Sequence, residues 1–167
     1  MASEKHSPAP VPIDSPDRRR LPPLLRRAWY GLNQAFRRRM PHPKVTPDQF
    51  TALRTLSEAD PKGITQSELT GAMSSDPNTI ASLLERMEKA GWVERKPHER
   101  DRRANRIQLL PSGRRKFEQL RDIAVELQMQ ALAALPEERR ERFLADLSLV
   151  ADACRNAADT APRPPRK

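Results

Sequence analysis

The side chains best suited to chemistry lie in residues 98–114, HERDRRANRIQLLPSGR. Five arginines surround a single aspartate there, and an alternating apolar stretch follows. An arginine guanidinium is planar, always charged, and donates paired hydrogen bonds to a phosphate or to a guanine edge. A basic run taken alone is more often a solvated face. The stretch therefore predicts a nucleic-acid contact only if the elements around it can present it to DNA or RNA.

The charge of the whole chain points the same way. The 167 residues carry 31 Lys and Arg against 22 Asp and Glu, a net charge of +9, and 24 of the cations are arginine. Residues 1–43 hold nine cations and three anions, 44–116 hold fourteen and ten, and 117–167 hold eight and nine. Such an excess attracts nucleic acid or an anionic membrane surface. Charge by itself does not choose between these partners.

Other features of the sequence bear on the cellular compartment of the protein. No apolar run approaches the roughly 18 residues that span a bilayer, and the N-terminal sequence lacks the apolar centre of a secretion signal. The single cysteine, Cys154, excludes a disulfide framework within the chain and fits a reducing compartment. We therefore expect a cytoplasmic protein without a membrane partner.

Catalysis is not supported by any motif. The sequence shows no nucleophile–base set, no phosphate-cradling glycine loop and only five glycines. His6, His42 and His98 do not have the spacing of metal ligands. We expect no enzyme activity, no cofactor and no metal site.

Apolar periodicity predicts the elements that must position the arginines. Apolar residues that recur at three- and four-residue steps indicate one helix over 21–40 and a second from Pro47 to the helix-breaking sequence EADPKG at 58–63. Thr65 with Glu68 has the form of a capping box, and Asp76 followed by Pro77 predicts the start of a further helix that ends at Gly91. Two strands, WVERK and RIQLL, then flank the cationic loop 97–105. Two long helices follow, separated by Pro136.

This order predicts a mainly α-helical protein with a small β-hairpin wing. The hairpin directly follows a helix-turn-helix, so the second helix of the pair can enter a major groove. A thin arginine-rich hairpin can then enter the narrow, strongly negative minor groove. The expected domains are a basic, Pro-rich disordered tail over 1–20, one domain over 21–158 and a disordered tail over 159–167.

Residues 79–114 resemble the MarR family of winged-helix transcriptional regulators. The helix end LERMEKAGWVERK, the wing sequence DRRA and the following Gly-Arg occur together at the family's spacing. The resemblance implies a winged helix-turn-helix over about 44–112 and dimerisation helices over about 21–40 and 113–158. It implies a homodimer on a pseudopalindromic duplex, most simply a repressor that a small lipophilic or phenolic effector releases.

The resemblance also assigns roles in the wing. Asp101 would hold the wing arginines, Arg103 would insert into the minor groove, and Arg100 and Arg102 would bind flanking phosphates. Exposed positions on the helix after Pro77 are expected to read bases or phosphates, because Asn pairs with adenine and Arg with guanine. Backbone N–H groups at the preceding helix start could meet phosphate. The further expected DNA-binding residues are Thr65, Gln66, Ser75, Asn78, Thr79, Ser82 and Arg86.

Three expectations concern regulation. By resemblance, an effector would bind near Trp29, Leu32, Phe36 and Phe50, although such a cluster is more often core. Cys154 could sense oxidants, but it shares a helical stripe with Leu147 and Val150, which predicts a buried, structural thiol. The alternatives to an effector-released repressor are an architectural dimeric DNA-binding protein without ligand sensing and a redox-sensing regulator that uses Cys154.

Overall fold

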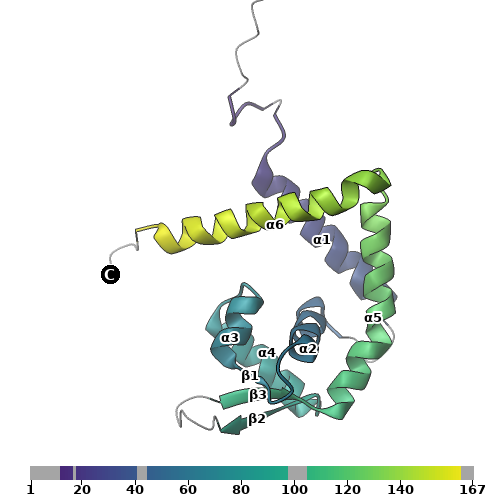
Figure 1. The fold of residues 1–167 in the computed structure, drawn as a ribbon, viewed down its shortest axis with the longest axis vertical. Coiled ribbons are helices and arrows are strands. Elements are labelled where there is room, and N and C mark those ends of the chain that lie inside the picture. The colour runs from purple at the N-terminus through teal and green to yellow at the C-terminus, as the bar shows by residue number, and fades with distance from the viewer. Residues whose placement is uncertain (1–11, 17, 41–44, 98–104, 163–167) are drawn as a thin grey trace, which may run out of the picture. The chain divides into compact units, whose positions relative to one another are not determined.

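The structure is a computed structural model that describes residues 12–16, 18–40, 45–97 and 105–162 (Figure 1). The chain forms two compact units, Met1–Ala124 and Val125–Lys167, and each is described by itself. The elements in chain order are α1 (Leu21–Arg39), α2 (Pro47–Glu58), β1 (Ile64–Thr65), α3 (Gln66–Ala72), α4 (Pro77–Lys89), β2 (Val93–Pro97), β3 (Asn105–Leu109), α5 (Pro111–Leu132) and α6 (Glu137–Thr160).

Capping boxes form the starts of α2 and α3, and the sequence predicts the second of them. At α2, Gln49 N–H donates to Thr46 Oγ1 over 3.2 Å, and Thr46 N–H donates to Gln49 Oε1 over 2.9 Å. Thr65 and Glu68 form the same reciprocal pair at the start of α3. Each pair satisfies backbone donors that a helix start leaves without intrahelical partners. The predicted starts of these helices are therefore confirmed.

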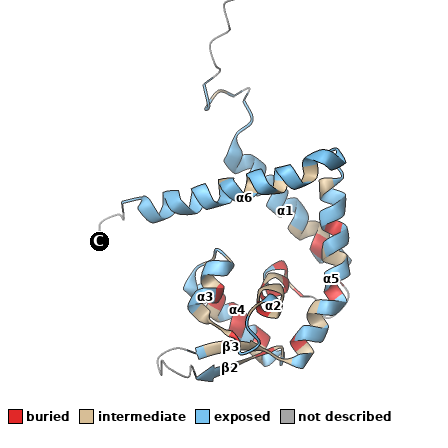
Figure 2. Cartoon of the chain, in the orientation of Figure 1, coloured by how far each residue is buried: buried red, intermediate tan, exposed pale blue. Residues whose placement is uncertain are grey.

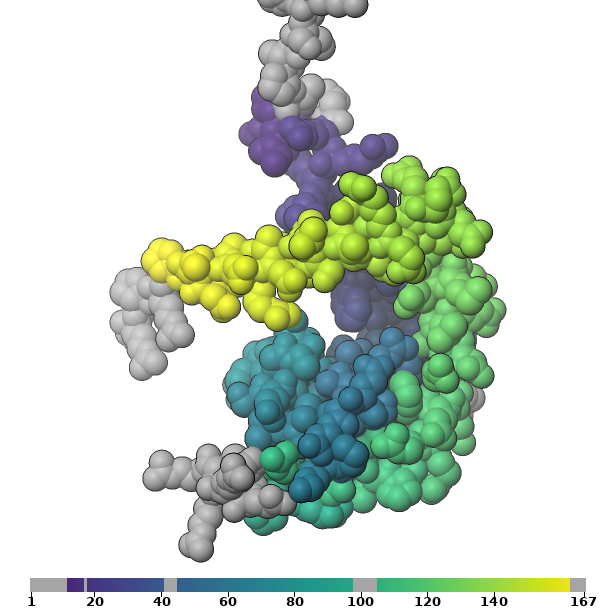
Figure 3. Space-filling view, in the orientation of Figure 1, coloured from purple at the N-terminus to yellow at the C-terminus, as the bar shows by residue number. Residues whose placement is uncertain are grey.

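The core of the first unit lies where α2, α3, α4 and the sheet meet. Red buried segments face one another on these elements in Figure 2, and α2 and α3 lie side by side in Figure 3. The predicted apolar stripes supply this core, and burying each of its Val, Leu, Ile and Met side chains contributes about 1.5–3 kcal/mol relative to exposure. The buried members are Ala52, Leu53, Leu56, Leu69, Ile80, Leu83, Leu84, Met87, Val93 and Ile107.

The sheet has one more strand than the sequence predicts. β2 and β3 form the expected antiparallel hairpin, but β1 pairs with the other edge of β3, which gives the order β1-β3-β2. Ile64 lies opposite Ile107 and Thr65 opposite Arg106. A two-residue strand is too short to show an alternating pattern, so only its long-range pairing reveals it.

The segment before β1 is held tightly against β3. Arg106 Nη1 donates to the Gly63 carbonyl over 2.7 Å, and Gln108 Nε2 donates to the Pro61 carbonyl over 3.1 Å. Gly63 has a φ of +87°, and a Cβ built there would lie 2.3 Å from the Ile107 carbonyl oxygen. Only glycine fits both the positive φ and this close approach.

In the second unit, α6 contains no buried residue and is pale blue along most of its length in Figure 2. Phe143 and Leu149 are 44% and 69% exposed, and Cys154 is exposed. The expectation of a buried Cys154 is therefore wrong for the single chain. A periodic apolar stripe predicts a face that packs against something, but it does not show that the chain itself supplies the covering surface. α6 also continues to Thr160, two residues beyond the predicted end of the domain.

We expect Gly63→Ala to lower the free energy of unfolding by at least about 2 kcal/mol, because the added methyl meets rigid backbone at a positive φ. Urea denaturation followed by circular dichroism measures this. Gly71→Ala is the matched control, since a Cβ at Gly71 has no neighbour within 4 Å. That variant should be unchanged or up to about 1 kcal/mol more stable. Equal effects of the two substitutions would contradict the close-approach argument.

Candidate nucleic-acid interface

α4 presents two different faces. Ile80, Leu83, Leu84 and Met87 are 0–1% exposed and point into the core. The opposite face carries polar and charged side chains at helical spacing, and these are exposed. Burial of the first face therefore fixes which residues the helix can offer to a partner. The exposed members are Asn78, Thr79, Ser82, Glu85, Arg86 and Lys89.

Asp76 caps the start of α4, as its position predicted. One carboxylate oxygen accepts from Asn78 N–H over 3.0 Å and from Thr79 N–H over 2.9 Å, while the other accepts from Thr79 Oγ1. The hydrogen bond from the Thr79 hydroxyl, followed by that from the Thr79 backbone, lowers the pKa of Asp76 below 3.8. The carboxylate is therefore ionised at neutral pH, and both of its oxygens are engaged locally.

The predicted residues Thr65, Gln66 and Ser75 make local contacts in the helix-turn-helix. Gln66 Nε2 donates to the Pro77 carbonyl over 3.3 Å, which links the first turn of α3 to the first turn of α4. Thr65 N–H and Oγ1 both donate to Glu68 Oε2, over 2.7 and 2.8 Å. Ser75 is half-buried, and its N–H donates to the Thr70 carbonyl over 3.2 Å. Gln66 thus joins the two helices, while Thr65 caps α3 and the Ser75 backbone closes the turn between them.

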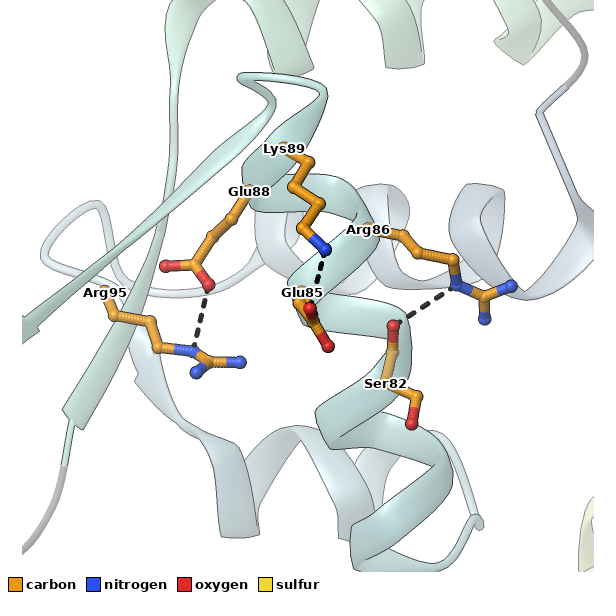
Figure 4. A network of polar contacts seen from close by, with 6 residues as sticks. All are labelled: Ser82, Glu85, Arg86, Glu88, Lys89 and Arg95. Carbon is orange, nitrogen blue, oxygen red and sulfur yellow. Dashed lines mark hydrogen bonds and ion pairs between the residues drawn. The ribbon is translucent and has the colours of Figure 1, made fainter.

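The C-terminal half of α4 carries a set of ion pairs that the sequence analysis missed (Figure 4). Lys89 Nζ lies 2.7 Å from Glu85 Oε1, and Arg95 Nε on β2 lies 3.4 Å from Glu88 Oε2. The ammonium of Lys89, through its hydrogen bond and then its charge, lowers the pKa of Glu85. The Lys89–Glu85 pair is exposed and such pairs contribute little to stability, so Lys89 can exchange its carboxylate partner for a phosphate at small cost.

Arg86 differs from these cations because its Nε donates to the Ser82 carbonyl over 3.2 Å, within α4 itself (Figure 4). The cations beside it on β2, Arg95 and Lys96, are also exposed. The basic pair in the strand WVERK was the signal available in the sequence. The alternating pattern of that strand did not reveal the ion pair of Arg95, because its partner Glu88 lies on α4.

The described part of the hairpin ends at Pro97 and Asn105. Pro97 pairs with Asn105, and Lys96 pairs with Arg106 one step before it. The predicted wing contacts Arg100, Asp101, Arg102 and Arg103 lie outside the described residues.

The four residues expected near an effector separate into two sets. Phe36 and Phe50 are each 6% exposed, and their ring centroids are 5.2 Å apart. Phe50 also stacks on Phe117 at 5.7 Å. Trp29 and Leu32 are instead 56% and 40% exposed on α1. Phe36 and Phe50 therefore belong to the packing between α1, α2 and α5. Trp29 and Leu32 belong to an exposed face of α1.

The described residues contain no group of three or more His, Cys, Asp or Glu side chains placed to hold a metal ion. No described helix is long and apolar enough to cross a membrane.

A capped helix-turn-helix followed by a hairpin on a three-stranded sheet defines a winged helix-turn-helix DNA-binding protein. A sequence model of the MarR family matches residues 45–104. The transcriptional regulator HosA of Escherichia coli is 30% identical over 126 residues, which cover 72% of this chain and 92% of HosA. The chain belongs to the MarR family of transcriptional regulators.

Two further relatives extend the comparison. The regulator PecS of Dickeya dadantii is 32% identical over 108 residues, which cover 64% of this chain but only 65% of PecS. The crystal structure of the M. tuberculosis regulator MosR in complex with DNA superposes with a TM-score of 0.65 at 29% identity. It covers 79% of this chain and 96% of MosR. The expected winged-helix fold and family are thus confirmed.

The Asp76 cap should make stability depend on pH in a defined direction. In the folded protein the pKa of Asp76 lies below its ordinary value of 3.8. The ionised cap therefore stabilises the fold at pH values above 3.8, and this stabilisation is lost as the pH falls through the pKa of the folded state. We expect the difference in unfolding free energy between the parent and Asp76→Ala to be full at pH 7 and to shrink in the acidic range. Denaturant titrations at several pH values measure this difference.

Asp76→Asn is the control for this titration, since asparagine caps well but does not ionise. Its stability relative to Asp76→Ala should stay constant over the same pH range. Parallel curves for the parent and Asp76→Ala down to the lowest pH would contradict the assignment of the cap.

Proposed function

We propose that this protein is a homodimeric transcriptional regulator that binds a pseudopalindromic duplex, with α4 of each copy in a major groove. The observation that carries the proposal is the orientation of α4. Its apolar face is fully used by the core, so Asn78, Thr79, Ser82 and Arg86 are directed outward on a rigid helix. These are the side-chain types that read base edges and phosphates.

The wing completes this interface in the proposal. β2 and β3 carry Arg95, Lys96 and Arg106 up to the segment 98–104. Arg103 from that segment would enter the minor groove, where flanking phosphates make the potential most negative. Arg100 and Arg102 would bind phosphates beside it, with Asp101 holding the cluster together. The DNA complex of MosR, a protein of the same fold, supports duplex DNA as the partner.

The proposed dimer is supported by exposed apolar side chains in both units. On α1, Trp29 and Tyr30 are 56% and 65% exposed. On α6, Phe143 and Leu149 are 44% and 69% exposed. Apolar surface of this extent usually marks an interaction site. A two-fold dimer would place its recognition helices roughly 34 Å apart, one turn of DNA.

Regulation would follow from the same geometry. We infer a repressor, because a dimer that spans both half-sites blocks access to the DNA beneath it. A small lipophilic or phenolic effector that changes the separation of the two α4 helices would shift the population able to span them. The open face at Trp29 and Leu32 is the favoured place for such a molecule to bind. We infer a regulator of this kind, without enzyme activity.

Footprinting on the promoter beside its own gene tests the proposal and separates it from an architectural role. A regulator should protect one or a few discrete palindromes, whereas an architectural protein should coat DNA with little sequence preference. Continuous coating at every concentration that gives binding would favour the architectural alternative.

Arg103→Ala should weaken binding to the protected site by about fivefold or more, since loss of one groove-reading arginine costs about 1–3 kcal/mol. Fluorescence anisotropy at matched salt measures the loss, and light scattering shows whether the dimer persists. Arg142→Ala is the matched control, because it removes an equal charge from α6, where the side chain is 84% exposed and pairs with Asp146. An undiminished affinity of Arg103→Ala would refute the wing assignment.

The exposure of Cys154 makes the redox alternative testable. We expect the parent and Cys154→Ser to lose DNA binding to the same extent after peroxide treatment. The physical reason is that the sequence holds no second cysteine with which Cys154 could form a disulfide within the chain. Loss of binding by the parent alone would instead favour a redox-sensing regulator.

A further inference from the structure

The hydrogen bond between Thr79 and Asp76 has a fixed direction. The Thr79 hydroxyl donates to the Asp76 carboxylate, and the second carboxylate oxygen is occupied by two backbone N–H groups. An ionised carboxylate can only accept hydrogen bonds. The single proton of the Thr79 hydroxyl is therefore committed to Asp76.

What remains on Thr79 is an acceptor. A hydroxyl carries one proton and two lone pairs, so the oxygen that donates to Asp76 can still accept from a third group. Thr79 is exposed, as are Asn78 before it and Ser82 one turn later. A partner that meets this face of α4 would thus find an oxygen acceptor at residue 79.

We propose that Asp76 sets the base preference of this protein by holding Thr79 as a hydrogen-bond acceptor toward the major groove. This inference rests on the proposed function, in which α4 lies in that groove. The donors on major-groove edges are the N6 amino group of adenine and the N4 amino group of cytosine. Guanine presents only acceptors there, N7 and O6, and these cannot pair with an acceptor. The base that meets Thr79 should therefore be adenine or cytosine, and guanine should be rejected.

Asp76→Asn reverses the direction of this hydrogen bond without removing the cap. Asparagine is as good an N-cap as aspartate, because its side-chain oxygen still accepts from the backbone. Its NH2 group, however, donates to Thr79 Oγ1, which frees the threonine proton to donate outward. Residue 79 would then favour an acceptor such as guanine O6 or N7.

The experiment compares the parent with Asp76→Asn on a library of duplexes in which every base pair of the half-site is varied, at one salt concentration. The parent should prefer adenine or cytosine at the position that meets Thr79. In Asp76→Asn the ratio of affinities for guanine over adenine at that position should rise about tenfold. Removal of one negative charge raises the affinity for all sequences together, so only the ratios count.

Two variants of Thr79 serve as matched controls. Thr79→Ser keeps the hydroxyl and should keep the parent's preference. In a Thr79→Val background no hydroxyl can be reversed, so adding Asp76→Asn should leave the ratios unchanged. Thermal unfolding of each variant shows that the fold persists.

The inference is overturned if Asp76→Asn keeps the parent's ratios at every position, or if the same change occurs in the Thr79→Val background. Sequence-specific binding with unchanged ratios would leave the proposed function standing. A parent protein that prefers no sequence at all would overturn both.

Discussion

The rotation of α4 about its own axis is the constraint on which the rest of the interface depends. Successive residues of a helix are about 100° apart, so the positions of the buried residues determine which residues face outward. Leu83 and Leu84 are 1% and 0% exposed, and turning either out of the core would cost about 2–5 kcal/mol in lost packing. The outward face of α4 is consequently fixed before any partner arrives.

The ends of α4 are fixed as firmly as its rotation. At the start, Asp76 holds the first turn, and Gln66 joins it to α3. At the end, Gly91 has a φ of +69°, and Trp92 N–H donates to the Met87 carbonyl over 3.0 Å. Trp92, packed against the core, then leads directly into β2. The start of β2 is thereby anchored to the same core that fixes α4.

Local signals made most of this fold predictable from sequence. Caps such as Thr65 with Glu68 operate over three residues, and the stripe from Ile80 to Met87 repeats over two turns, so both are visible in the sequence. Contacts between distant residues were not visible. The pairing of Ile64 with Ile107 and the ion pair between Glu88 and Arg95 depend on how elements meet in space. The exposure of Cys154 was missed because a stripe shows that a face is apolar but not what covers it.

The acidic residues beside α4 would explain how the proposed DNA interface, in a chain with a net charge of +9, can still be selective. Asp76, Glu85, Glu88 and Glu94 each have a partner within the protein, three of them cations. Paired cations attract a distant polyanion less, because the opposite charges cancel within a Debye length of about 8 Å. At contact the exposed pairs are weak enough to open. In the proposed DNA complex, attraction to arbitrary DNA would thus be reduced, while a duplex that also matches the polar face of α4 would still gain the phosphate contacts. Specificity would then come from hydrogen-bond direction on that face rather than from the net charge.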